Sequence, residues 1–321
     1  MKTDQNNASS ANKGFLIALI SAMTLAFTGI LIRLISDNYQ LPALVIAFWR
    51  DAFVVICALP FFLVINPKLI VVKKSDIPFL ILFGAVLAVF NITWTLAVTL
   101  TGAAVATVLV YSSAGFTAVL GWLFLNEQLG LKKSLAVILC LGGCVLVSGA
   151  TQAQAWQTNP IGILSGLLSG LLYALYSLMG RRGSQKSINP WTILLYAFLF
   201  AAFFLLLINL LPIGFIPGKA LRPADLFQLR NEWRGWLLLL ILAAGPTLVG
   251  FGLYNVSLGL LPSSTANLIL TTEPVLTALI AYFMLGERFT IQEVIGAGLI
   301  ITALVLIRVR AKHQFSHKFS N

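Results

Sequence analysis

The sequence has few charged residues. Asp, Glu, Lys and Arg together make up 10% of its 321 residues, whereas ordinary soluble domains carry about 25%. Apolar residues make up 59% of the chain, in runs that approach or exceed the length needed to cross a bilayer. The composition excludes an ordinary soluble domain. Because the runs are continuous rather than alternating, it predicts an all-α integral membrane protein whose partner is the lipid bilayer.

Histidine and cysteine are also scarce. The two histidines, His313 and His317, lie in the polar C-terminal tail, which excludes a His-based metal site or catalytic triad in the apolar segments. Cys57, Cys140 and Cys144 lie within apolar runs and are interpreted as small packing residues. The sequence has no phosphate-binding loop with its lysine, no HExxH and no CxxC, so it predicts no metal, no cofactor and no ATP-driven step.

Acidic residues are outnumbered by basic ones, and the net charge is +11. The Lys and Arg residues concentrate in short loops and in the C-terminal tail, as the positive-inside rule requires of cytoplasmic segments. This explains the charge without a nucleic-acid partner. It also predicts that both termini are cytoplasmic, in a protein of the cell's inner (plasma) membrane.

Apolar runs predict ten transmembrane helices. We expect them at residues 14–36, 42–66, 76–98, 101–125, 131–149, 160–180, 189–211, 235–258, 262–285 and 290–308. The chain then divides into an N-terminal tail (1–13), a first five-helix repeat (14–150), a linker (151–159), a second five-helix repeat (160–308) and a C-terminal tail (309–321). The longer loop over 212–234 leaves open a short interfacial helix at 221–229 and a solvated loop.

The sequence contains an internal repeat, in which the second half of the chain resembles the first. Thr101–Val147 aligns with Leu261–Ile307 without a gap, so that Glu127 falls on Glu287. The N-terminal part repeats with a different shift, which brings Gly14, Ser21, Ala26 and Arg33 onto Gly162, Ser169, Ala174 and Arg181. Because each half has an odd number of spans, the second half enters the membrane inverted. Inverted repeats are typical of secondary transporters with a binding site near the bilayer midplane.

Short motifs resemble those of a known family. Glu273-Pro274-Val275 followed by Leu285-Gly286-Glu287-Arg288 is similar to the signature of EamA-type transporters in the drug/metabolite transporter superfamily. The first half keeps only the second element, Leu125-Asn126-Glu127-Gln128. The resemblance implies ten helices in two inverted repeats around a central cavity, with the fourth helix of each half lining it and the fifth at the periphery. It also implies a secondary carrier, without naming its cargo.

Ionisable residues within apolar segments are costly and therefore point to function. Glu273 lies near the middle of the ninth segment, where Pro274 is expected to loosen the helix and Thr271 and Thr272 to satisfy freed backbone groups. Its carboxyl is a candidate to bind a substrate amine or a coupling proton, because burial favours the uncharged form of an acid. A purely structural role, hydrogen-bonded across helices, is the alternative.

Arg50 and Asp51 are the next candidates for an intramembrane charge. As neighbours on a helix they point about 100° apart, so we expect them not to pair with each other. Arg50 is a candidate partner for a substrate carboxylate. The alternatives are pairs between helices, of Arg50 with Glu273 or of Asp51 with Arg33.

Polar and aromatic side chains complete the predicted substrate cavity, because amides and hydroxyls rarely face lipid. In addition to Glu273, the candidates are Asn91, Trp94, Tyr111, Ser112, Tyr173, Tyr176, Tyr254, Asn255, Asn267 and Thr271. Their rings suit a flat or ammonium-bearing molecule. Glu127 and Glu287, at equivalent helix ends, are candidates for a gate or for fixed helix-end contacts, with Lys132 or Lys133 beside Glu127.

Together these features predict an alternating-access secondary transporter, not an enzyme. Its small-molecule cargo is expected to be an exported amino acid or a related metabolite, with proton coupling through Glu273 as a further hypothesis. A nucleotide-sugar or sugar-phosphate carrier, a passive channel, and an intramembrane enzyme acting on a lipid-linked substrate remain alternatives. A monomer and a homodimer both fit the sequence.

Overall fold

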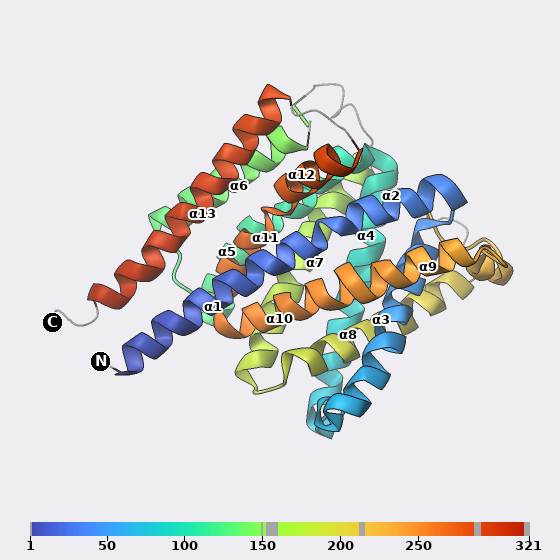
Figure 1. The fold of residues 1–321 in the computed structure, drawn as a ribbon, viewed down its shortest axis with the longest axis horizontal. Coiled ribbons are helices and arrows are strands. Elements are labelled where there is room, and N and C mark those ends of the chain that lie inside the picture. Colours follow the sequence, from blue (N-terminus) through green and yellow to red (C-terminus); the bar gives the residue numbers. More distant parts are fainter. Residues whose placement is uncertain (1, 149, 152–159, 212–215, 286–289, 318–321) are drawn as a thin grey trace.

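The computed structural model describes residues 2–148, 150–151, 160–211, 216–285 and 290–317. These residues fold into a bundle of helices in which no strand occurs (Figure 1). The first half comprises α1 (Lys2–Leu25), α2 (Phe27–Tyr39), α3 (Ala43–Ile65), η1 (Pro67–Leu69), η2 (Lys74–Asp76), α4 (Ile77–Tyr111), α5 (Ser113–Leu125) and α6 (Leu131–Val147). The second comprises α7 (Pro160–Gln185), α8 (Pro190–Leu210), η4 (Pro223–Phe227), α9 (Trp233–Leu242), η5 (Ala243–Gly250), α10 (Phe251–Leu260), α11 (Ser263–Leu270), α12 (Glu273–Leu285) and α13 (Ile291–His317).

Within the described ranges, seven helical segments are long and apolar enough to cross a bilayer. They are Ser10–Tyr39, Ala43–Ile65, Lys74–Thr101, Val105–Leu125, Pro160–Gln185, Pro190–Leu210 and Trp233–Leu260. The other predicted segments are shorter or interrupted: α6 has 17 residues, the ninth segment is divided into α11 and α12, and the apolar part of α13 is Ile291–Leu306. Large apolar side chains such as Val64, Phe283 and Leu131 are exposed on the outer surface, as lipid contact requires.

α4 contains a reversal of chain direction. Along its first part, the rings of Phe83 and Phe90 pack against Tyr176 and Tyr173 of α7, with ring centroids 4.7 and 5.4 Å apart, so this part runs antiparallel to α7. Beyond Leu100, which faces Gly162, the direction changes, and Leu109 and Ser112 face Gly166 and Gly170 in turn. The parts of α4 before and after Leu100 therefore run in opposite directions. This agrees with the predicted separation of residues 76–98 from 101–125.

Among the described residues, four of the predicted segments are interrupted rather than continuous. The fourth segment, residues 101–125, breaks at Ser112 between α4 and α5, and the other three are the first, the eighth and the ninth. The first breaks at Ala26, whose carbonyl accepts a hydrogen bond from Thr277 Oγ1 at 3.1 Å. The eighth widens into the π-helix η5 around Pro246, where the Thr247 hydroxyl donates to the Leu242 carbonyl at 2.8 Å. The ninth breaks at Thr271 and Thr272, as expected from Pro274. Both threonine hydroxyls donate to backbone carbonyls there, at 2.6 and 2.7 Å.

Glycines allow two close helix contacts. Gly143 of α6 and Gly296 of α13 meet so closely that a Cβ on either would lie 2.7 Å from the backbone oxygen of the other. The pair α6 and α13 lies beside the remaining bundle (Figure 1). On α7, Gly166 and Gly170 lie against the end of α4, where Leu109 faces both of them.

Replacing Gly170 with alanine is expected to destabilise the fold by about 1–3 kcal/mol, because the new Cβ would lie 2.8 Å from the Leu109 carbonyl oxygen. Gly298→Ala is the matched control, since nothing lies within 4 Å of a Cβ at that position. Thermal unfolding in detergent would measure both variants. Equal stability of the two would contradict the close packing of α7 on α4.

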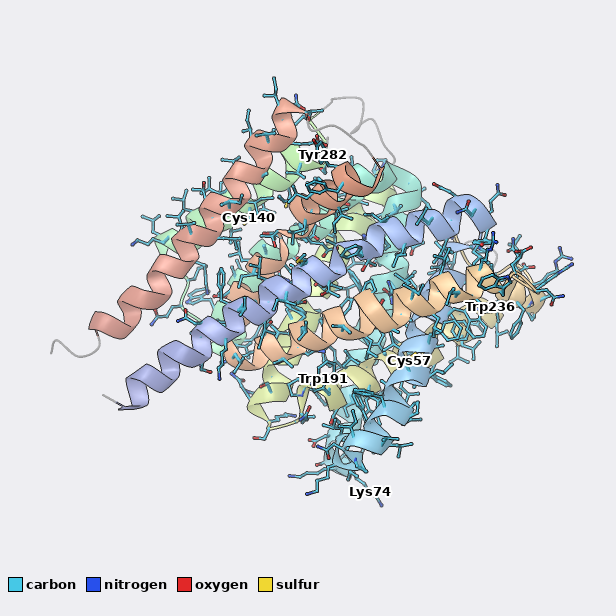
Figure 2. The ribbon with its side chains drawn as sticks, in the orientation of Figure 1. Cys57, Lys74, Cys140, Trp191, Trp236 and Tyr282 are labelled. Atoms are coloured by element: carbon cyan, nitrogen blue, oxygen red, sulfur yellow. The ribbon has the colours of Figure 1, made fainter. Side chains whose placement is uncertain are left out.

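The loop before α9 forms a short helix. Within the predicted 221–229 segment, Pro223–Phe227 forms η4, and the indole N–H of Trp49 donates to the Leu226 carbonyl at 2.6 Å. Trp236 packs edge-on against Trp49 with ring centroids 4.9 Å apart, at the end of the bundle away from the N-terminus of α1 (Figure 2). The short helix is thus held against α3 and α9 rather than being a solvated loop.

Candidate functional site

A cavity of about 460 Å³ lies between the two halves of the chain. This volume is in the range of small-molecule sites. Of the predicted residues, the cavity is lined by Arg50, Asn91, Trp94, Tyr111, Tyr173 and Glu273. It is also lined by residues that the sequence analysis missed, among them Leu25, Thr28, Gly29, Phe90, Thr107, Phe251 and Thr277. The aromatic ones among these lie in long apolar runs and carry no sequence signal that distinguishes a cavity wall from ordinary core.

Arg50, Asp51 and Asn91 form a closed hydrogen-bonded ring, here called the Arg50 cluster. Arg50 Nε donates to Asp51 Oδ1 at 3.1 Å, and Arg50 Nη2 donates to Asn91 Oδ1 at 2.9 Å. Asn91 Nδ2 in turn donates to Asp51 Oδ2 at 3.0 Å. Asp51 is fully buried, while Arg50 also borders the cavity and has guanidinium donors outside the ring.

The expectation that Arg50 and Asp51 do not pair was therefore wrong. Adjacent backbone positions do diverge on a helix, but the long Arg50 side chain folds back far enough to reach its neighbour. The Asn91 amide of α4 hydrogen-bonds to both the Arg50 guanidinium and the Asp51 carboxylate. The contact between Arg50 and Asp51 is therefore supported by a side chain from another helix. The alternative pair of Arg50 with Glu273 is not seen among the described residues. The other alternative, Asp51 with Arg33, stays untested because the side chain of Arg33 lies outside the described part of the structure.

Glu273 is the first residue of α12, and its half-buried side chain faces the cavity. The Tyr111 hydroxyl lies beside its carboxyl, and its other titratable neighbours are Tyr173 and Cys144. Among the described residues, no Lys or Arg forms an ion pair with it. The cavity therefore presents a carboxyl group and a guanidinium group that are not paired with each other.

Other predicted cavity residues lie behind the cavity wall, in a group of buried hydrogen-bonded side chains that we call the polar network. It consists of Ser113, Tyr176, Ser177, Tyr254, Asn255 and Asn267, and all six are at most 1% exposed. Ser177 Oγ and Tyr254 Oη are 2.6 Å apart, and Asn267 Nδ2 donates to Ser177 Oγ at 3.1 Å. Ser113 Oγ donates to Asn267 Oδ1 at 3.2 Å, and Asn255 Nδ2 donates to Tyr176 Oη at 3.1 Å.

Two further predicted residues are placed elsewhere. The buried Thr271 hydroxyl lies 3.1 Å from Cys140 Sγ, while Ser112 donates to the Leu109 carbonyl at 2.5 Å at the break before α5. Neither lines the cavity. Their positions fit structural roles at helix interruptions.

Glu127, in the first half of the chain, contacts the start of α11 in the second half. Its carboxylate accepts hydrogen bonds from the backbone N–H groups of Ser263 and Ser264 at 2.5 and 3.2 Å, and from both serine hydroxyls. Lys133 Nζ lies 3.8 Å from the carboxylate and 2.5 Å from Ser264 Oγ. We call Glu127, Lys133, Ser263 and Ser264 the Glu127 cluster. The expected proximity of Lys133 is confirmed, whereas Glu287 lies outside the described residues.

The local backbone explains this contact. Asn126 takes a left-handed conformation, with φ 53°, and turns the chain back after α5. Gly121 leaves room for the carboxylate, since a Cβ there would lie 2.9 Å from Glu127 Oε2. Nearby, Arg181 Nη1 donates to the carbonyls of Leu258 and Gly259 at the end of α10. Charged side chains thus fix both helix ends at the α10–α11 junction.

Replacing Glu127 with glutamine is expected to cost about 2 kcal/mol of stability, because charge-assisted hydrogen bonds to α11 are lost. Glu293→Gln is the matched control: Glu293 accepts from Thr290 at the exposed start of α13, where a cap contributes about 1 kcal/mol or less. Unfolding in detergent would compare the variants. A loss no larger for Glu127 than for Glu293 would contradict a stabilising contact between the halves.

Comparison with known proteins supports the resemblance seen in the sequence. The model of the EamA-like transporter family matches residues 12–149 and again residues 160–309. The chain belongs to the EamA-like transporter family. It is an integral membrane protein, and its two halves each match the same family unit.

Individual relatives agree with this assignment. An "Uncharacterized transporter" of Archaeoglobus fulgidus is 27% identical over 68% of this chain and 74% of its own length. The "Uncharacterized transporter YwfM" of Bacillus subtilis is 25% identical over 76% of this chain and 77% of its own. "Solute carrier family 35 member F5" of Macaca fascicularis is 33% identical, over 36% of this chain and 27% of its own. A crystal structure with 17% identity superposes with a TM-score of 0.72, over 95% of this chain and 98% of its own, and shows the same fold.

Proposed function

We propose that this EamA-like transporter is an alternating-access secondary carrier that exports amino acids or related small zwitterions across the cytoplasmic membrane. The observation that carries the proposal is the cavity that has both Arg50 and Glu273 on its wall, with no ion pair between them among the described residues. A zwitterion places its carboxylate on the guanidinium and its ammonium on the carboxyl, and each contact is charge-assisted. Phe90, Trp94 and Tyr173 offer rings for its side chain.

Ten crossings in two inverted five-helix repeats are part of the proposal. Its support is the double family match, the reversal within α4 and the helix breaks at Ser112 and at Thr271–Thr272, which are equivalent positions of the two halves. Discontinuous helices at equivalent positions are typical of the binding site in inverted-repeat carriers. The basic loops favour cytoplasmic termini, and α1 begins at the same end of the molecule at which α13 finishes (Figure 1).

A cargo with several negative charges fits this cavity less well. The Glu273 carboxyl would repel the phosphates of a nucleotide sugar, and the Arg50 guanidinium, the one such group among the described lining residues, is already partly compensated by Asp51. An amine or a zwitterion meets no such repulsion. We therefore favour the amino-acid class over the sugar-phosphate class.

Flux into proteoliposomes tests the proposal. Purified protein is expected to give saturable flux of at least one labelled amino acid, with a rate that responds to an imposed pH gradient if protons are coupled. A thermal-shift screen against amino acids, amines, nucleosides and sugars would first select the class that stabilises the protein. Flux that never saturates would indicate a channel, and stabilisation by nucleotide sugars alone would overturn the amino-acid assignment.

A further inference from the structure

Arg50 presents only part of its guanidinium to the cavity. Of the five N–H donors that a guanidinium has, the Arg50 cluster uses two: Nε donates to Asp51 Oδ1 at 3.1 Å, and Nη2 donates to Asn91 Oδ1 at 2.9 Å. Because Asn91 also reaches Asp51, both acceptors lie along the edge that Nε and Nη2 share. The remaining donors, on Nη1 and Nη2, form the opposite edge, which we call the end fork.

The end fork is bonded to no acceptor within the part of the chain that the structure describes. In that part, Asp51 is the one carboxylate within ion-pair distance of Arg50, and both of its oxygens are engaged, by Arg50 Nε and by Asn91 Nδ2. Arg50 borders the cavity, and Glu273 on the same wall does not pair with it. The end fork is therefore the part of the guanidinium that a ligand in the cavity can bind.

Asn91 keeps Arg50 and Asp51 from pairing more tightly. Arginine and carboxylate groups often form two parallel hydrogen bonds, whereas Arg50 and Asp51 share one. The Asn91 amide takes the place of the second, since its Oδ1 accepts from Nη2 and its Nδ2 donates to Asp51 Oδ2. Exchange of the amide oxygen and nitrogen would set donor against donor, so the orientation is fixed. Without this amide, Asp51 Oδ2 would draw Nη2 onto itself and turn the guanidinium.

Burial holds the three side chains in place. Asp51 is 0% exposed, Asn91 3% and Arg50 8%, so water competes little for their hydrogen bonds. A guanidinium that is already oriented loses little freedom when a ligand binds. The end fork is thus a pre-oriented pair of donors on the cavity wall.

Building on the proposed function, in which the carboxylate of the cargo binds Arg50, we propose that Asp51 and Asn91 are positioning residues. They occupy one edge of the guanidinium and aim its end fork into the cavity, where it receives one carboxylate in bidentate geometry. Asp51 holds Nε and compensates the charge of Arg50. Asn91 keeps the guanidinium from closing onto Asp51. The site thereby selects a ligand by the direction of its two oxygens and not by negative charge alone.

Protection of Arg50 from phenylglyoxal gives a test that needs no amino acid. This dicarbonyl reagent condenses with both terminal nitrogens of a guanidinium, so it attacks the end fork, and mass spectrometry of the peptide containing Arg50 measures the reaction. In the parent protein we expect benzoate to protect Arg50 at a concentration about tenfold or more below that of benzamide, which has the same shape but no charge. Chloride is the comparison anion, because a spherical ion depends little on the direction of the fork.

Asn91→Leu separates direction from charge, because it removes the amide and keeps Arg50 and Asp51. We expect the half-protecting concentration of benzoate to rise about tenfold, as loss of one charge-assisted hydrogen bond requires, and that of chloride to change by less than about twofold. Asn91→Gln, which keeps an amide, should recover part of the effect. Asn209→Leu is the matched control, since it removes another buried amide, away from the cavity lining, and should alter neither anion.

The parent protein alone can contradict the proposal, even if Asn91→Leu does not fold. An Arg50 that does not react, or benzoate that protects no better than benzamide, would overturn it. So would an Asn91→Leu variant in which benzoate and chloride protection change by the same factor. Protection by benzoate in a protein that shows no amino-acid flux would overturn the proposed cargo and leave the roles of Asp51 and Asn91 standing.

Discussion

Asp51→Ala is expected to lower the free energy of unfolding by about 3 kcal/mol. Removing one partner of a buried ion pair leaves the other charge uncompensated, which typically costs about 3–5 kcal/mol. Asp51 is fully buried and holds both Arg50 and Asn91, so its loss also leaves the Asn91 amide without its acceptor. The lower end of the range applies because Arg50 borders the cavity and retains some access to water.

Unfolding in mixed micelles with a rising fraction of denaturing detergent would measure this loss. Asp76→Ala is the matched control, since Asp76 lies at the start of α4 and makes no side-chain cap bond there. The double variant Arg50→Met/Asp51→Leu is expected to recover much of the stability, because it removes the buried charges together. If Asp51→Ala were no worse than Asp76→Ala, the Arg50 cluster would not be a stabilising element.

Sequence reasoning predicted the fold well where repetition and hydrophobic length decide it. The family resemblance is confirmed, the chain is all-helical, and the break at Thr271–Thr272 follows from Pro274 as expected. The π-helix around Pro246 and the break at Ala26 were not predicted. The break at Ala26 coincides with a distant contact, the hydrogen bond from Thr277, which leaves no local pattern in the sequence. The π-helix does have a local signal that was overlooked, because Pro246 lacks a backbone N–H and disrupts a helix interior as Pro274 does.

The candidate site was predicted in part, for a physical reason. Polarity within an apolar span indicates that a residue faces the interior, but it does not tell a cavity wall from a hydrogen-bonded core. Asn267 and Tyr254 are as polar as Asn91 and Tyr111, yet the former pair is closed in the polar network. The packing of the two halves decides which of these side chains line the cavity, and only the three-dimensional arrangement reveals it.

Glu273→Gln is expected to weaken cargo binding by about tenfold or more and to abolish any response of flux to a pH gradient. A charge-assisted hydrogen bond contributes about 1.5–3 kcal/mol, and each 1.4 kcal/mol is a factor of ten in affinity. Glutamine keeps the shape of the side chain and its contact with Tyr111, but it neither attracts an ammonium group nor takes up a proton. The effect should therefore appear in binding and coupling rather than in folding.

Two further variants separate charge from packing. Tyr111→Phe removes the hydroxyl beside Glu273 but leaves the carboxyl, so it should retain more of the affinity and the pH response. Glu232→Gln makes the same chemical change at an exposed position and should alter neither. Saturable flux measured for all three, with and without the gradient, gives the comparison. If Glu273→Gln left affinity and pH response unchanged, this carboxyl would be a structural group. The ammonium of the cargo would then need another partner, although Glu273 carries the one carboxyl among the described residues that line the cavity.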